Sequence, residues 1–147
     1  MKARMFITLC ILSLLSLIAP IHVYAEAETV AHEEAYIELE PLWDNTARMS
    51  VGLLINNSGR ATMSGSVIGN PGTTSITVNA VLQRVNSNGT LTHIASFNNI
   101  RAEGEIWVWE RPHYVARGHD YRLTLTATVV RNGTSEVVSL SRTTRAN

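Results

Sequence analysis

The fold is decided by one stretch, Val115-Ala116-Arg117-Gly118-His119-Asp120-Tyr121-Arg122-Leu123-Thr124-Leu125-Thr126-Ala127. From Tyr121 onward its apolar and polar residues alternate, and this period of two is typical of a strand with one face in the core. Gly118 predicts a turn just before that strand.

Other segments on both sides of this stretch show the same alternation, and Asn/Gly clusters separate several of them. Asn56-Asn57-Ser58-Gly59, Asn70-Pro71-Gly72, Asn86-Ser87-Asn88-Gly89 and Asn132-Gly133 predict turns. The strands expected around them are 47–55, 60–68, 76–83, 91–97, 103–111, 121–130 and 136–141. About seven short antiparallel strands at this spacing predict a single all-β sandwich.

The pair Gly118 and Tyr121 resembles the tyrosine corner of immunoglobulin-like and fibronectin type III domains. The resemblance implies that both residues are structural, with the Tyr121 ring capping the core and its hydroxyl bonding an upstream backbone group. Cys10 is the only cysteine, so the cysteine, tryptophan and cysteine pattern of a true immunoglobulin domain is missing.

A second resemblance covers about two thirds of the chain, from Met49 to Thr143. It rests on four segments, which are Ile55-Asn56-Asn57-Ser58-Gly59-Arg60-Ala61-Thr62, Ser64-Gly65-Ser66-Val67, Val81-Leu82-Gln83-Arg84 and Gly118-His119-Asp120-Tyr121-Arg122. On these segments the chain resembles a family of small secreted Gram-positive bacterial proteins of unknown function. The resemblance implies export and a sandwich fold, and it supplies no active-site residues.

The first 25 residues predict a signal peptide. Lys2 and Arg4 precede an apolar run over 6–19, and Val23-Tyr24-Ala25 provides a cleavage site. Cleavage there would remove Cys10, so the exported chain would have neither a disulfide nor a membrane span. The expected location is therefore outside the cell.

Charge divides the remaining chain into an acidic arm, 26–45, and a β domain, 46–147. Seven acidic residues and no Lys or Arg lie between Glu26 and Asp44, whereas ten arginines and five acidic residues follow Ala47. A solvated arm is the simpler interpretation of this asymmetry. The alternative is an arm that docks on the domain through Tyr36, Leu42 and Trp43. The arginines are dispersed, which argues against a nucleic-acid site.

The search for catalytic residues yields two weak candidates. Glu103 and Glu105 would share one face of a strand, as paired carboxylates do in glycosidases. His113, His119 and Asp120 could hold a metal, but the sequence contains no second cluster of ligands. Neither a nucleophile motif nor a glycine-rich phosphate loop is present. The sequence therefore predicts a protein that is not an enzyme and uses no cofactor.

Trp107 and Trp109 occupy alternate positions and so share one face of a strand with Arg111 and His113. If that face is exposed, the two indoles form a stacking platform for sugars or for a protein. If it is buried, Ile106 and Val108 are exposed instead. Burial of the tryptophans removes more apolar area from water and is the favoured interpretation.

The function expected from these features is that of a secreted, non-enzymatic binding module for an extracellular protein or glycan. The alternative is a secreted effector, such as an antimicrobial protein or an inhibitor, whose activity resides in the folded surface.

Overall fold

The computed structural model describes residues 43–147. The predicted signal peptide and all but the last three residues of the predicted arm lie outside these residues. The described chain forms seven strands: β1 (Thr46–Ile55), β2 (Arg60–Gly69), β3 (Thr73–Val85), β4 (Leu91–Glu103), β5 (Ile106–Tyr114), β6 (Asp120–Arg131) and β7 (Thr134–Arg145).

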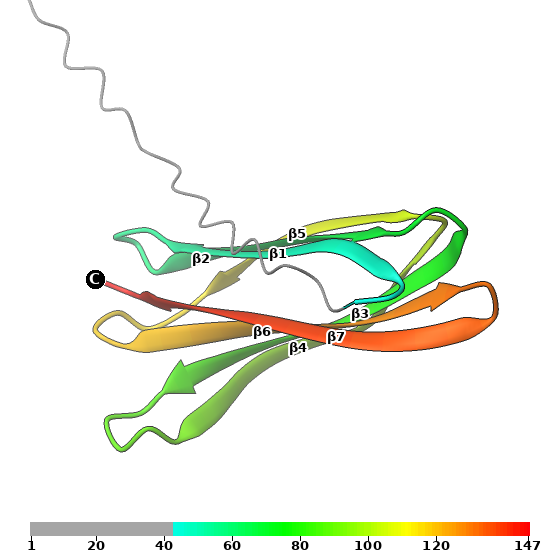
Figure 1. Cartoon of the computed structure of the whole chain (residues 1–147). Helices are drawn as coiled ribbons and strands as arrows, with labels where there is room; N and C mark the ends of the chain where they lie inside the picture. Colours follow the sequence, from blue (N-terminus) through cyan, green and yellow to red (C-terminus); the bar gives the residue numbers. More distant parts are fainter. Residues whose placement is uncertain (1–42) are drawn as a thin grey trace, which may run out of the picture. The chain divides into compact units, whose positions relative to one another are not determined.

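The strands form two antiparallel sheets that pack face to face (Figure 1). One sheet has three strands in the order β1-β2-β5, and the other has four in the order β4-β3-β6-β7. The predicted all-β sandwich of about seven antiparallel strands is confirmed, and its arrangement is consistent with an immunoglobulin-like or fibronectin type III-like fold.

Three hairpins stay within a sheet, and their turn residues explain their tightness. In the β6–β7 hairpin the central residues Asn132 and Gly133 have φ of 49° and 78°, the left-handed values that a two-residue turn requires. In the β1–β2 hairpin the Gly59 amide donates to the Asn56 carbonyl at 2.9 Å. The other connections, β2–β3, β4–β5 and β5–β6, pass from one sheet to the other.

One predicted boundary is wrong in a way that affects the candidate site. The sequence suggested a strand over 103–111, but Glu103 ends β4 and the next strand begins at Ile106. Gly104, with φ of 89°, turns the chain between the two sheets, a conformation that L side chains rarely adopt. β4 therefore runs six residues beyond the predicted end at Phe97.

The core lies between the sheets and follows the alternation of each strand. On β3 and β6 the inner residues are completely buried; they are Ile76, Val78, Ala80, Leu82, Leu123, Leu125, Ala127 and Val129. β1 and β2 contribute Met49, Leu53, Ala61, Met63 and Val67. The described residues thus hold both sheets and a hydrophobic core of their own.

The residues just before β1 are bound to the rest of the domain by several hydrogen bonds, three of them to one carboxylate. Glu136 accepts hydrogen bonds from the Asp44 amide at 2.8 Å, the Asn45 amide at 3.1 Å and the Thr46 hydroxyl at 2.8 Å. The Asn45 side chain also donates to the carbonyls of Val129 and Thr134. The last residues of the predicted arm therefore belong to the folded domain.

Candidate binding surface

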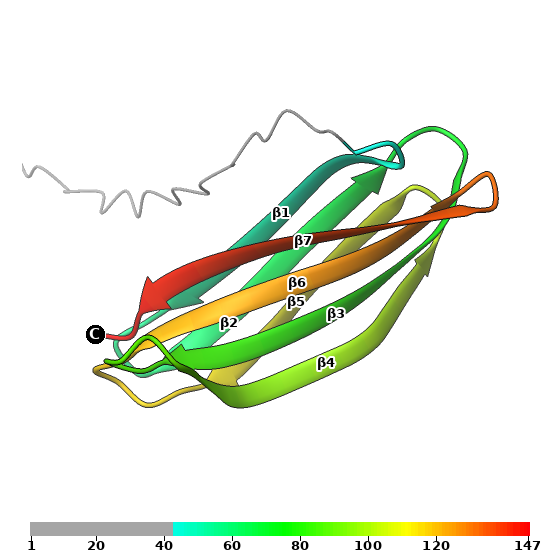
Figure 2. The same ribbon diagram turned by 60° about the horizontal axis from the view of Figure 1, so that its bottom comes forward.

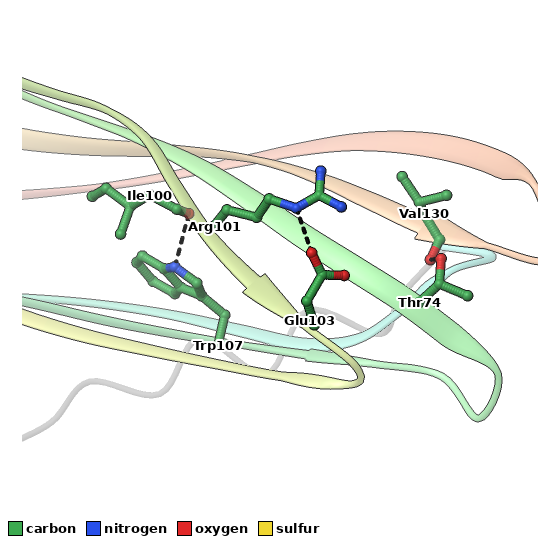
Figure 3. A network of polar contacts seen from close by, with 6 residues as sticks. All are labelled: Thr74, Ile100, Arg101, Glu103, Trp107 and Val130. Carbon is green, nitrogen blue, oxygen red and sulfur yellow. Dashed lines mark hydrogen bonds and ion pairs between the residues drawn. The ribbon is translucent and has the colours of Figure 1, made fainter.

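The two tryptophans of β5 lie in the core. Trp107 is 2% and Trp109 is 8% exposed. Their rings stack at 6.3 Å between centroids, and Phe97 of β4 lies 5.4 Å from Trp109. The Trp107 Nε1 donates to the Ile100 carbonyl at 3.1 Å (Figure 3). The alternative of an exposed stacking platform is therefore wrong, because the indoles are used to fill the space between β5 and β4.

The predicted patch of Trp107, Trp109, Arg111 and His113 is thus divided. Arg111 is exposed and His113 half-buried toward the far end of β5, where the inner face leaves the core. The two polar residues share a face with the tryptophans, as expected from their spacing. No common exposed surface joins the four side chains.

The outer face of β5 carries the exposed apolar side chains instead. Ile106, Val108 and Tyr114 are 63%, 75% and 71% exposed. Ile68 of β2, 36% exposed, pairs with Ile106 across the ladder. Clusters of exposed large apolar residues mark interaction sites more often than isolated ones do. We call Ile68, Ile106 and Val108 the β5 apolar patch.

Short side chains lie beside the patch on β1 and β2, whereas the more distant positions of this face carry the exposed residues Arg48, Leu54, Arg60 and Glu110. Ser64 and Ser66 of β2 lie beside Gly52 and Ser50 of β1, and the Ser50 and Ser66 hydroxyls bond each other at 2.8 Å. The β5 apolar patch is therefore bordered on the β2 side by serines. The sequence predicted this face, since Ile106 and Val108 were expected to be exposed if the two tryptophans were buried.

The free edge of β5 can be assigned from two hydrogen bonds. The Gly69 amide donates to the Glu105 carbonyl at 2.8 Å, and the Val115 amide donates to the Gly59 carbonyl at 2.9 Å. Bonded and non-bonded pairs alternate along an antiparallel ladder, so the odd-numbered residues of β5 bond β2. The even-numbered residues, from Ile106 to Glu110, direct their N–H and C=O groups to the free edge, where Pro112 ends the series of donors.

Within residues 43–147 no strand pairs with this edge of β5. The Thr144 hydroxyl donates to the Leu53 carbonyl at 2.8 Å, which sets β7 against β1, and Gly65 of β2 packs against Leu125 of β6. The inner side chains of β5 contact β4, since the Phe97 ring lies 5.4 Å from the Trp109 ring and the Trp107 Nε1 bonds the Ile100 carbonyl. In Figure 2 the four-stranded sheet lies in front of the three-stranded sheet. We call the place beside the free edge of β5 the open strand position.

The inner side chains of the two outer strands of the four-stranded sheet are less buried than those of its central strands. On β4, Ala95, Phe97, Ile100 and Ala102 pack against the core but stay half-buried, whereas the inner residues of neighbouring β3 are completely buried. On β7, Val138 is 3% exposed and Leu140 is half-buried.

The tyrosine at the start of β6 occupies the predicted position. Tyr121 is 1% exposed, and its hydroxyl donates to the Ala116 carbonyl at 2.8 Å. This is the geometry of a tyrosine corner. Gly118, with φ of 81°, forms the preceding turn, and its amide donates to the Ala146 carbonyl.

The catalytic candidates do not form a cluster. Glu105 lies in the turn after β4 and accepts a hydrogen bond from the Gly72 amide. Glu103 lies at the end of β4 and pairs with Arg101 at 2.7 Å. The two carboxylates are therefore not on one strand as proposed from the sequence. Between Trp43 and Asn147 no three His, Cys, Asp or Glu side chains gather as a metal site would require.

The ion pair on β4 perturbs the titration of both partners. The hydrogen bond from Arg101, followed by its positive charge, holds the pKa of Glu103 below the ordinary value of 4.5 against the opposing effect of desolvation. The same contact raises the pKa of Arg101. Both side chains are well exposed (Figure 3), so this pair is a surface feature.

Within residues 43–147 no helix reaches the length and apolar character needed to cross a membrane.

Comparison with known proteins shows only distant structural likeness. No family model and no curated protein matches the chain. A Bacteroides uniformis β-glucuronidase 2, solved with a covalently bound cyclophellitol-6-carboxylate aziridine, aligns over 67% of this chain with 17% identity and a TM-score of 0.42. This chain spans 13% of that enzyme. CsgH from R. palustris aligns over 63% of this chain and 88% of its own, with 13% identity and a TM-score of 0.32. Neither likeness carries a functional conclusion.

Proposed function

We propose that the protein is a non-enzymatic binding module that acts outside the cell and recognises another protein through β5. The predicted signal peptide supports export, and the resemblance to small secreted bacterial proteins of unknown function agrees with it. The observation that carries the proposal is the combination of the β5 apolar patch with open backbone groups on the same strand.

Two properties of β5 favour a protein partner over a glycan. A sugar platform needs neighbouring exposed aromatic rings, but both indoles of β5 are buried and Tyr114 is the one exposed aromatic side chain of this strand. A polypeptide can bond the free N–H and C=O groups of Ile106 and Val108 and place apolar side chains against theirs. This is the strand-addition mode, in which backbone bonds supply affinity and alternate side chains supply specificity.

The test uses residues 43–147, which contain both sheets and the core, as bait for intact extracellular proteins and for a glycan array. Val108→Lys places a charge in the β5 apolar patch. Val137→Lys is the matched control, because Val137 is also an exposed valine, 66% exposed on β7.

The proposal expects a captured protein whose affinity falls at least about tenfold with Val108→Lys, since about 1.4 kcal/mol of apolar contact would be lost. The control should bind as the unaltered domain does. Equal binding by both variants, or specific retention on glycans alone, would contradict a β5 protein site. Killing of neighbouring cells by the purified domain would favour the effector alternative.

A further inference from the structure

The residues around Val108 form a nearly symmetric sequence, Glu105-Ile106-Trp107-Val108-Trp109-Glu110-Arg111. One tryptophan lies on either side of Val108 at equal spacing. Glu105 and Arg111, which carry opposite charges, lie three positions before and after it. When an antiparallel pair of strands is centred on one residue, positions at equal distances before and after that residue lie opposite each other. A second copy of this strand would therefore place Arg111 opposite Glu105.

The same centre falls at the middle of the free edge of β5. The open N–H and C=O groups belong to Ile106, Val108 and Glu110. Gly104, with φ of 89°, turns the chain before this run, and Pro112, which has no N–H, ends it. Both lie four positions from Val108, so in a pair centred there they fall outside the bonded run. A pair centred one residue earlier or later would set an open residue opposite Gly104 or Pro112 and lose hydrogen bonds.

From these observations we infer that β5 of a second copy of this chain occupies the open strand position, antiparallel to β5 and related to it by a twofold axis at Val108. The inference deepens the proposed function, on which it rests, by naming a partner for the β5 edge. The two sheets would join into one of six strands, three from each copy. Such a contact is isologous, because both copies use the same surface.

The backbone groups of the two strands match in this register. Val108 lies opposite Val108 of the second copy, and Ile106 lies opposite Glu110 of the second copy. Each of these pairs exchanges two hydrogen bonds, because the residues of a bonded pair in an antiparallel ladder donate to and accept from each other. All open donors from Ile106 to Glu110 thus find an acceptor. Backbone bonds of this kind supply the affinity in strand addition.

The side chains of the outer face join the β5 apolar patches of the two copies. The Val108 side chains, each 75% exposed in one copy, meet across the twofold axis. Ile106, 63% exposed, lies diagonally opposite Val108 of the second copy. Glu110 lies at the border of this contact, where its carboxylate stays in water. An apolar centre with a charged rim is the usual composition of a protein interface.

An ion pair at each end of the paired strands favours a second copy over an unrelated strand. Arg111 is exposed and forms no ion pair within residues 43–147. Glu105 is also exposed, and its Oε1 accepts the Gly72 amide, so Oε2 can accept from Arg111 of the second copy. Both residues are odd-numbered and form a non-bonded pair, in which opposite side chains approach most closely. Twofold symmetry forms this contact twice.

A single cysteine tests the position of the twofold axis. Residues 43–147 contain no cysteine, and in Val108→Cys the two Cα atoms would lie about 5.5 Å apart, within the range of a disulfide. We expect a covalent dimer under mild oxidation. The matched control Val137→Cys, at an exposed valine of β7, should form one at least about tenfold more slowly, because its thiols are not held together. Crosslinking of Val108→Cys no faster than that of the control would overturn the inference.

Sedimentation equilibrium measures the association without cysteines, and charge reversal tests the register. Residues 43–147 should form a dimer. Arg111→Glu would set like charges opposite each other at both ends and should weaken the dimer at least about tenfold. Adding Glu105→Arg restores opposite charges and should recover affinity. Arg48→Glu, at an exposed arginine of β1, is the control and should dimerise normally. A monomeric domain, an effect of Arg111→Glu no larger than the control's, or no recovery in the double variant would overturn the inference.

The chain expected after signal cleavage, residues 26–147, should form the same dimer, and a monomer there would also overturn the inference. These experiments contain this chain alone. Their failure would therefore leave the capture test of the proposed function, which presents other extracellular proteins, to stand separately. A dimer together with an empty capture would support the inference and contradict recognition of a different protein.

Discussion

The two lateral sides of the sandwich are closed in different ways. On the β1–β7 side, hydrogen bonds between polar side chains and the backbone connect the sheets. Thr144 donates to the Leu53 carbonyl. Glu136 accepts hydrogen bonds from Asp44, Asn45 and Thr46. On the β4–β5 side, aromatic side chains connect the sheets. Trp107, Trp109 and Phe97 fill the space, and one indole bond reaches the backbone of β4.

This difference determines which side can accept another chain. The polar contacts of the β1–β7 side already use part of the edge, whereas β5 keeps open groups from Ile106 to Glu110. The β4–β5 side also has features that limit unwanted pairing, since Pro112 interrupts the donors of β5 and Asn99, with φ of 56°, distorts β4. The remaining open stretch of β5 is short and apolar, which suits one added strand.

The largest expected loss of stability comes from removing an aromatic side chain on the β4–β5 side. Trp107→Ala should lower the free energy of unfolding by about 3–5 kcal/mol, because it leaves a large cavity and an unpaired Ile100 carbonyl. Denaturant unfolding measures the change. The matched substitution Val108→Ala alters a side chain that is 75% exposed and should cost less than about 1 kcal/mol. Similar losses for both would mean that the indole does not support the β4–β5 side.

Breaking the closed side should cost less. Glu136→Ala removes the acceptor of three hydrogen bonds, and we expect a loss of about 2 kcal/mol, since bonds to a charged group contribute about 1.5–3 kcal/mol and this site is only half-buried. Glu105→Ala is the control, because Glu105 is exposed and accepts a bond from the Gly72 amide. A loss no larger than the control's would show that the clamp around Glu136 does not hold the closed side.

The sequence predicted the sheets better than it predicted their edges. Alternation and turn residues sufficed for the strands because each signal is local: Tyr121 to Val129 bury every second residue, and Asn132-Gly133 makes its own turn. The Glu136 clamp joins residues about 90 positions apart, and nothing in the local pattern of either segment announces it.

The candidate site was predictable only as a choice between two faces. The spacing of Trp107 and Trp109 placed them together, and the greater apolar area of indole favoured their burial. The strand pattern could not show that β5 is an outer strand among the described residues, because this depends on how the seven strands are divided between two sheets. The misplaced start of β5 has a simpler cause, since Gly104 lies within an otherwise strand-like run from Ile100 to Trp109.

A substitution at the β5–β6 crossing should have an intermediate effect on the free energy of unfolding. Tyr121→Phe retains the buried ring but removes the hydroxyl that bonds the Ala116 carbonyl. We expect a loss of about 1–2 kcal/mol in unfolding free energy, because a partly buried acceptor is left without its donor. Thermal and denaturant unfolding measure it. Tyr114→Phe, at a 71% exposed position, is the matched control, and an unchanged stability in Tyr121→Phe would remove the tyrosine corner as a support of the β5–β6 crossing.

The smallest effect on stability is expected for the ion pair between Arg101 and Glu103 on β4. This pair lies on the β4–β5 side, and both of its side chains are exposed. Arg101 holds the pKa of Glu103 below 4.5, so any stability that the pair adds is complete above about pH 4.5 and is lost as the pH falls through the lower folded pKa. Carboxyl titration by NMR should therefore show Glu103 titrating below its ordinary range. In Arg101→Gln the pKa of Glu103 should rise toward 4.5, whereas unfolding at pH 7 should change little because exposed pairs are screened by solvent. A large loss of stability in Arg101→Gln would mean that charge, and not the aromatic cluster alone, holds β4 against β5.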